Sequence, residues 1–162
     1  MDAVKDLNIT ENTTIKELIS QFSEAGGFSA SKVAKAAKII KNMQSDKDCF
    51  KILSHPACIV STGTRGLIRD LVKNKKVDAI MTTCGTLDHD LARLWKDYYQ
   101  GSFMMDDKEL HKKGINRLGN ILIPNECYGE VLEDNLQPII KKLHAKRKEW
   151  SVHELIWAFG EA

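Results

Sequence analysis

Three ionisable side chains, Asp88, His89 and Asp90, stand next to one another directly after a run of small and hydroxyl-bearing residues that begins at Thr82. If they face a cleft, the carboxylates can neutralise the ammonium groups of a polyamine, and a neutral imidazole can accept a proton from an amine. The acids also suit a purely structural role, because carboxylates in the first turn of a helix complement its dipole. Spacing alone leaves both interpretations open.

A second run rich in small residues extends from Ser54 to Gly66 and leads into a predicted helix. Its backbone amides are placed where they could bind a phosphate group. It is not a Walker loop, because no Gly-Lys-Ser/Thr follows, and it lacks the Gly-x-Gly-x-x-Gly fingerprint of dinucleotide-binding folds. The Gly63-x-x-Gly66 spacing is also common in ordinary helix starts, so by itself it favours a structural role.

Cys84 precedes a predicted helix, where a thiol tends toward the thiolate, and His89 is the only evident base for a nucleophilic cysteine. Zinc held by Cys84 and His89 would lack a second ligand pair to complete four-coordination, so no metal site is predicted. The chain has four cysteines, Cys49, Cys58, Cys84 and Cys127. They lie far apart in the sequence and form no Cys-x-x-Cys pair, so a disulfide framework has little support.

Two strand-then-helix units position these segments. Residues 50–53 form an apolar run of strand length, and a helical pattern follows Gly66. Residues 77–82 are rich in strand formers and precede a helical pattern that reaches Trp95. Ligands of a parallel sheet bind outside the carboxyl ends of its strands, which is where both segments fall.

The remaining pattern continues the alternation. After an irregular stretch that contains Gly101 and Gly114, residues 120–123 predict a third strand that is stopped by Pro124, and a long helix carries apolar residues from Val131 to Leu143. This order predicts a parallel sheet covered by helices.

Helical patterns also open and close the chain. Thr14 and Glu17 have capping-box spacing before an amphipathic helix that ends at Gly26-Gly27, and a second helix follows to about residue 45. Ser151 and Glu154 have the same spacing before a last helix, which Gly160 can terminate.

Composition excludes several classes of protein. The chain has 162 residues, of which 43% are hydrophobic and 28% charged, as in ordinary globular domains. The net charge of +2 comes from interleaved acidic and basic residues, so no nucleic-acid partner is predicted. No apolar run is long enough for a bilayer, and the start resembles neither a secretory nor an organellar leader, so the cytosol is the expected location.

Taken in order, these segments resemble the deoxyhypusine synthase family, especially its archaeal members. The resemblance is carried by the run from Ser54 to Gly66, the segment from Thr82 to Asp90, and the block Gly114-Ile-Asn-Arg-Leu-Gly-Asn-Ile-Leu-Ile-Pro-Asn-Glu-Cys-Tyr128. It reaches the closing Trp150-Ser-Val-His-Glu-Leu-Ile-Trp helix and covers essentially the whole chain.

The fold that the resemblance implies is α/β: a Rossmann-like, deoxyhypusine synthase-like three-layer parallel sheet, incomplete in this chain. Residues 1–47 are then an N-terminal helical arm, and residues 48–162 the N-terminal half of an NAD-binding domain.

The resemblance implies a transferase, usually a homotetramer, that uses NAD to oxidise spermidine and passes the aminobutyl group to a lysine of the initiation factor 5A precursor. A covalent imine on an enzyme lysine lies between these steps. By position in the motifs, the residues expected to face the dinucleotide are Ala57, Cys58, Ser61, Thr83, Cys84 and Gly85. Asp88 and His89 are expected to line the spermidine pocket.

The chain departs from the family pattern in both segments. Many eukaryotic members have Ser-Asn at Ala57-Cys58 and two glutamates at Asp88-His89, so the direct contacts to NAD and to the amine are expected to differ. The related homospermidine synthases, which transfer the butyl group to a free polyamine, share these motifs, so a homospermidine synthase-like enzyme is a second hypothesis.

The family's nucleophilic lysine follows Trp-Gly in a C-terminal half, and no Trp-Gly-Lys occurs in this sequence. Lys96 follows Trp95 directly, and we expect it to be exposed to solvent rather than catalytic. No catalytic residue is therefore assigned, and activity is expected only with a complementary C-terminal half or with full-length subunits in an oligomer. The sequence is also compatible with a non-catalytic regulatory or degenerate paralogue, and with a small independent module that binds NAD or phosphate.

Overall fold

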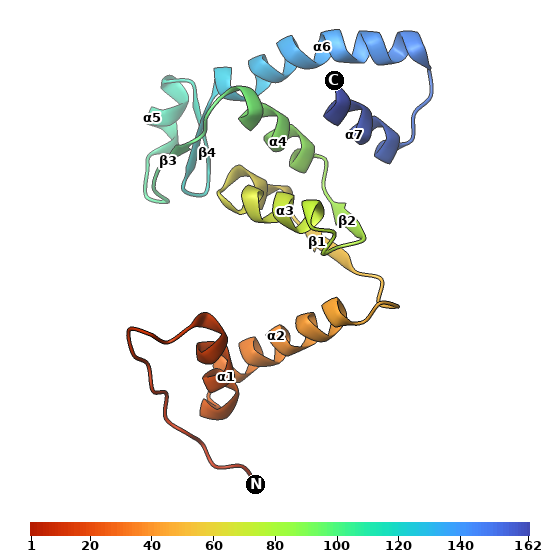
Figure 1. The fold of residues 1–162 in the computed structure, drawn as a ribbon. Coiled ribbons are helices and arrows are strands. Elements are labelled where there is room, and N and C mark those ends of the chain that lie inside the picture. The colour runs from red at the N-terminus through yellow and green to blue at the C-terminus, as the bar shows by residue number, and fades with distance from the viewer. The chain divides into compact units, whose positions relative to one another are not determined.

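The computed structural model describes residues 1–162, and the chain divides into two compact units, Met1–Lys51 and Ile52–Ala162 (Figure 1). The structure is a mixed α/β fold with one small parallel and one small antiparallel sheet. No helix is both long enough and apolar enough to cross a membrane.

The first unit is a pair of packed helices, α1 (Ile15–Ala25) and α2 (Ala30–Ser45). The predicted capping box is confirmed: the Thr14 hydroxyl accepts from the backbone N–H of Glu17, and the Glu17 carboxylate accepts from the backbone N–H of Thr14. Gly26 ends α1 at φ +63°, a backbone conformation that glycine adopts without strain.

The second unit begins with the two predicted strand-then-helix units. Strand β1 (Ile52–His55) leads through the 3₁₀ helix η1 (Ala57–Ser61) into α3 (Thr64–Lys73), and β2 (Ala79–Thr82) leads into α4 (Gly85–Trp95). The two strands are parallel, with Ile52 opposite Ala79 and His55 opposite Thr82. The prediction of parallel strands is correct for this pair.

The predicted third strand does not join them, and here the sequence-based prediction was wrong. Strand β5 (Ile121–Pro124) is the centre of a separate antiparallel sheet in the order β3-β5-β4, with β3 (Tyr99–Gln100) and β4 (Ile115–Leu118) at its edges. Only Gly119 and Asn120 separate β4 from β5, with Gly119 at φ +64°. A two-residue link can join only antiparallel neighbours, whereas parallel strands need a much longer crossover.

The stretch predicted to be irregular therefore contains two strands and a helix, α5 (Asp107–Lys112), whose N-cap is Asp106. After β5, the 3₁₀ helix η2 (Asn125–Cys127) and α6 (Gly129–Lys146) follow, and α7 (Val152–Glu161) closes the chain. The capping box of Ser151 and Glu154 is confirmed, but α7 continues through Gly160 rather than ending there.

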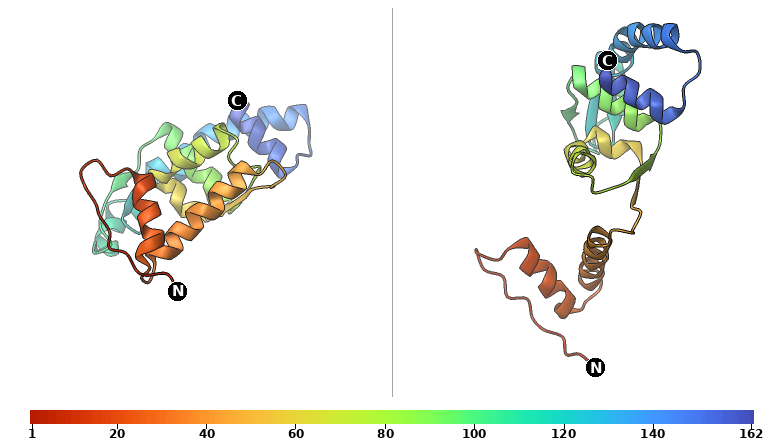
Figure 2. Two further views of the ribbon diagram at one scale, coloured as in Figure 1. Left: turned by 60° about the horizontal axis from the view of Figure 1, so that its bottom comes forward. Right: turned by 45° about the vertical axis from the view of Figure 1, so that its right-hand side comes forward.

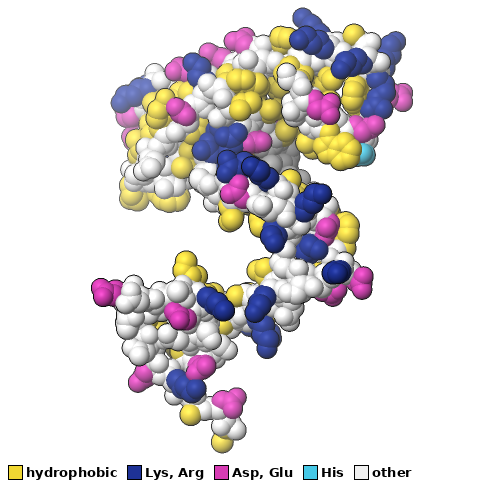
Figure 3. Space-filling view, in the orientation of Figure 1, with side chains coloured by type: hydrophobic (Ala, Val, Ile, Leu, Met, Phe, Trp, Pro, Cys, Tyr) yellow, Lys and Arg dark blue, Asp and Glu magenta, His cyan; other side chains and the backbone are white.

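The core of the second unit is small. Its buried apolar side chains include Val60 of η1, Ala92 of α4, Ile123 of β5 and Val131 of α6. Helix α4 contacts η1, which follows β1, as well as η2 and α6, which follow β5. The helices around α4 are seen from two further directions in Figure 2. Many apolar side chains lie on the surface instead (Figure 3), including Ile52 on β1 at 56% exposure and Met81 on β2 at 66%.

Candidate active site

The two small-residue segments meet at the carboxyl ends of β1 and β2. The backbone N–H of Ala57, at the start of η1, donates to the Thr83 hydroxyl at 3.2 Å. A Cβ placed on Gly85 would lie 3.0 Å from the Cβ of Ala57, tighter than ordinary van der Waals contact. The close approach of the two turns therefore requires small residues at positions 57 and 85.

A surface hollow of about 380 Å³ opens beside this junction, lined by residues from both strand ends: Ser54, His55, Pro56, Met81, Thr82 and Thr83. The Thr82 hydroxyl donates to the backbone carbonyl of His55 at 2.7 Å, which fixes the strand ends to each other. The His55 ring is buried and donates through Nδ1 to the Pro56 carbonyl at 3.1 Å. Its Nε2 has no partner within the chain, although a buried acceptor without a donor costs about 1–3 kcal/mol.

Asp88 and His89 lie in the first two turns of α4, each in contact with a tyrosine from another part of the chain. The Tyr128 hydroxyl, between η2 and α6, donates to Oδ2 of Asp88 at 3.1 Å. The Tyr98 hydroxyl, between α4 and β3, is 2.9 Å from Nδ1 of His89. The His89 ring lies edge-on to Tyr98 at 5.7 Å between centroids and tilted against Tyr128 at 5.3 Å. We call Asp88, His89, Tyr98 and Tyr128 the tyrosine–carboxylate cluster.

Burial controls the protonation of this cluster. It lowers the pKa of His89, Arg93 lowers it further, and the charge of Asp88 opposes both effects. The imidazole is therefore neutral at physiological pH. Burial raises the pKa of Tyr98 well above its usual range, and burial together with Asp88 raises the pKa of Tyr128 to about 12. Both phenols are therefore protonated at neutral pH, when they can donate hydrogen bonds.

Arg93 connects α4 to the end of η1. Its Nη1 donates to the carbonyl oxygens of Val60 and Thr62 at 2.7 Å and 2.6 Å. Its guanidinium also lies 5.8 Å from the centre of the Tyr98 ring. One side chain thus links the turn after β1 to the helix that carries Asp88 and His89.

The sequence model of the deoxyhypusine synthase family matches residues 17–162 of this chain. The chain belongs to the deoxyhypusine synthase family. Its relatives include proteins named probable deoxyhypusine synthase from three archaea. The identity is 51% over 160 residues with that of Picrophilus torridus, 52% over 157 residues with that of Thermoplasma acidophilum and 42% over 161 residues with that of Sulfolobus acidocaldarius.

These matches cover 99%, 97% and 99% of this chain but only 51%, 50% and 51% of the respective relatives. The chain therefore spans about half the length of the deoxyhypusine synthases that it matches.

The structure groups the family-motif residues unevenly. Ala57, Thr83 and Gly85 stand at the junction of the two turns. The side chains of Cys58 and Cys84 are exposed, whereas Ser61 is buried and its hydroxyl donates to the Cys58 carbonyl at 2.6 Å. Ser61 thus stabilises η1 from within.

Sequence reasoning from the family motifs missed Tyr98, Tyr128 and Arg93. Tyr128 ends the third block that carried the resemblance, so its position was marked without a role. Tyr98 and Arg93 had no comparable signal, because their partners become evident only in three dimensions.

Asp90, unlike Asp88 and His89, is directed to α3 and pairs with Arg65, whose Nη2 also donates to the Asp90 carbonyl at 3.0 Å.

No three His, Cys, Asp or Glu side chains gather where they could hold a metal ion, so Cys84 and His89 do not belong to such a cluster. The site instead offers backbone amides and small side chains at the strand ends, next to an acceptor-only carboxylate and a neutral imidazole. This combination suits a ligand that has both a polar, hydrogen-bonding part and a cationic amine.

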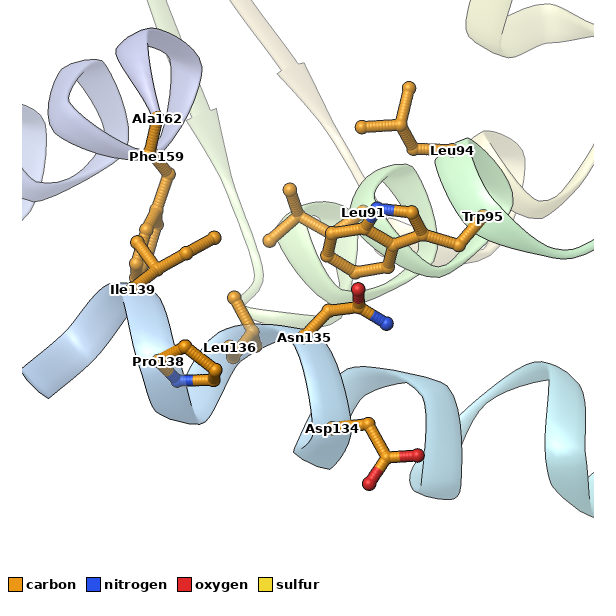
Figure 4. A pocket seen from close by; sticks show the side chains of 10 residues that line it. All are labelled: Leu91, Leu94, Trp95, Asp134, Asn135, Leu136, Pro138, Ile139, Phe159 and Ala162. Carbon is orange, nitrogen blue, oxygen red and sulfur yellow. The ribbon is translucent and has the colours of Figure 1, made fainter.

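The opposite end of α4 lines an apolar groove of about 410 Å³ between α4, α6 and α7 (Figure 4). Leu91 and Trp95 from α4 point toward Ile139 of α6 and Phe159 of α7 across it. The groove is lined by none of the residues of the tyrosine–carboxylate cluster.

Proposed function

We propose that this chain forms the N-terminal half of a deoxyhypusine synthase, which transfers the aminobutyl group of spermidine to a lysine of the initiation factor 5A precursor with NAD as cofactor. The observation that carries the proposal is the junction of the two turns at Ala57, Thr83 and Gly85, with Asp88 and His89 next to it on α4. Because the acceptor is a translation factor, we place the reaction in the cytosol.

The proposed dinucleotide site consists of Ala57, Cys58, Ser61, Thr83, Cys84 and Gly85. The close packing of Gly85 on Ala57 brings the two turns together, which larger side chains at these positions would prevent. The side chains of Cys58 and Cys84 are exposed there, and we expect Ser61 to contribute by holding the shape of η1. NAD supplies the hydride acceptor of the reaction when bound.

The proposed amine site consists of Asp88 and His89. The carboxylate of Asp88 accepts hydrogen bonds from an ammonium group and neutralises its charge. The neutral imidazole of His89 can take a proton from an amine, because burial lowers its pKa. We assign no nucleophile to this chain: Lys96 is exposed, just beyond the end of α4, and a lysine from a complementary half would form the imine.

The same proposal explains the incomplete sheet. Strands β1 and β2 pair only with each other, and a two-stranded sheet of four-residue strands is marginal on its own. The exposed Ile52 and Met81 leave apolar surface on one face of it. We propose that both strands belong to a larger Rossmann-like, three-layer parallel sheet, which a complementary half or full-length subunits complete in an oligomer.

The test is reconstitution. This chain is co-expressed with the half of the Picrophilus torridus relative that it does not match, and transfer of labelled aminobutyl from spermidine to the factor precursor is measured with and without NAD. We expect NAD-dependent transfer by the purified complex and none by either half alone. A stable complex without transfer would reject the proposal.

A matched pair of variants locates the amine site within that complex. Asp88→Asn removes the charge expected to hold an ammonium group, and we expect the KM for spermidine to rise about tenfold or more. Asp90→Asn is the control, because that carboxylate is engaged by Arg65 on α3. Equal effects of both changes would count against the assignment of Asp88.

A further inference from the structure

Tyr128 lies outside α4 and contacts both proposed amine-site residues. Its hydroxyl donates to Asp88 Oδ2 at 3.1 Å, and its ring lies 5.3 Å from the His89 ring. The two partners are separated from it by about 40 residues of chain, so the contact is tertiary and not a by-product of local helix geometry. Helix α4 and η2, which precedes Tyr128, pack against each other and hold this arrangement.

The direction of the hydrogen bond is determined by chemistry. An ionised carboxylate can only accept, so the phenol must donate. Burial and the charge of Asp88 together raise the pKa of Tyr128 to about 12, which keeps the phenol protonated at neutral pH. The Tyr128 hydroxyl therefore donates to Oδ2 of Asp88, and Oδ1 is the oxygen that we expect to accept from a ligand.

We propose that Tyr128 is a positioning residue of the amine site: its hydroxyl holds the Asp88 carboxylate in the rotamer that presents Oδ1 to a ligand ammonium, while its ring supports the imidazole of His89. This role rests on the proposed function, because it presupposes that an amine binds at Asp88. A carboxylate that is fixed before binding loses less conformational entropy when it receives the cation.

The hydroxyl, rather than the ring, performs the fixing. Tyr128→Phe removes only the donor and keeps the ring against His89, so it separates the two contributions. Tyr99→Phe is the matched control, because Tyr99 lies on β3 with its side chain exposed and outside the tyrosine–carboxylate cluster.

The experiment uses the complex of this chain with the unmatched half of the Picrophilus torridus relative, and measures the Kd of spermidine and, separately, of NAD by calorimetry. For Tyr128→Phe we expect the spermidine Kd to rise about tenfold, equivalent to about 1.4 kcal/mol, with the NAD Kd unchanged. Tyr99→Phe should leave both constants unchanged. A purely structural role would weaken NAD binding as well.

A double-mutant cycle with Asp88→Asn tests whether the effect passes through the carboxylate. In the Asp88→Asn background, Tyr128→Phe should change the spermidine Kd less than about twofold, because no charged group remains to be positioned. The same tenfold rise in both backgrounds would overturn the positioning role. So would an unchanged Kd in the single variant.

The two proposals fail differently. If the unmodified complex forms but does not bind spermidine, the proposed function is wrong and the role of Tyr128 falls with it. If spermidine binds and Tyr128→Phe has no effect, only the positioning role is wrong.

Discussion

Arg93 should be the most important single polar side chain for the stability of the second unit. Its Nη1 donates to two backbone carbonyls, those of Val60 and Thr62, at the end of η1. A hydrogen bond from a charged donor contributes about 1.5–3 kcal/mol, and the lower end applies here because the site is only partly buried. Arg93→Leu should therefore lower the free energy of unfolding by about 2–4 kcal/mol, since both carbonyls lose their donor.

The assay is urea denaturation of the chain, followed by circular dichroism, with hydrogen exchange of the amides of η1 as a local readout. Arg69→Leu is the matched control. Its side chain is 72% exposed and pairs with the adjacent Asp70, so its removal should change stability by less than about 0.5 kcal/mol. The amides of η1 should lose protection in Arg93→Leu but not in the control. Equal stability of the two variants would refute the idea that Arg93 fixes η1 to α4.

Two further outcomes are expected. Gly101→Ala should lower the free energy of unfolding by about 1–3 kcal/mol, because the new Cβ would lie 2.7 Å from Leu122 Cγ. Gly66→Ala is the control and should not destabilise α3, because a Cβ on Gly66 meets no atom within 4 Å. Urea denaturation of both variants measures the difference. The pKa of Glu154 is lowered from 4.5 to about 2. The largest cause is its hydrogen bond with Arg147, followed by its hydrogen bonds with Ser151 in the capping box of α7. The ionised Glu154 therefore stabilises α7 above about pH 4.5, and this stabilisation is lost as the pH falls toward 2. The protection of the α7 amides against hydrogen exchange should decline across that range. Glu154→Gln should abolish this pH dependence.

Local signals in the sequence were sufficient for most helices. Thr14 with Glu17 and Ser151 with Glu154 form capping boxes within a single turn, so their spacing in the sequence was sufficient to predict them. The alternation of β1, α3, β2 and α4 was likewise visible in strand-forming runs followed by helical periodicity. For the same reason the placement of Asp88 and His89 near the start of α4 followed from the sequence.

The antiparallel sheet was missed because only its central strand β5 was predicted, whereas its two edge strands carry weak signals: β4 contains the polar Asn116 and Arg117. Strand β3 consists of only Tyr99 and Gln100 and exists because β5 pairs with it. The useful clue was Gly119-Asn120 directly before the apolar run of residues 121–123, because a glycine at the first position is typical of a tight hairpin turn. Tyr128 could not be assigned for a related reason: its partner Asp88 is 40 residues away in the sequence, and the two meet only because η2 packs against α4.

The segment between Asp88 and Tyr128 contains the rest of α4, strands β3, β4 and β5, and helix α5. It ends at η2, which packs against α4. Its two ends are held together by the hydrogen bond between Tyr128 and Asp88, whereas Phe103 and Met104 are exposed in the turn between β3 and α5. Foreign sequence inserted at that turn, such as an affinity tag or a fluorophore site, should therefore not displace either end. The turn offers a handle for immobilising or labelling the molecule outside the residues proposed to bind its ligand.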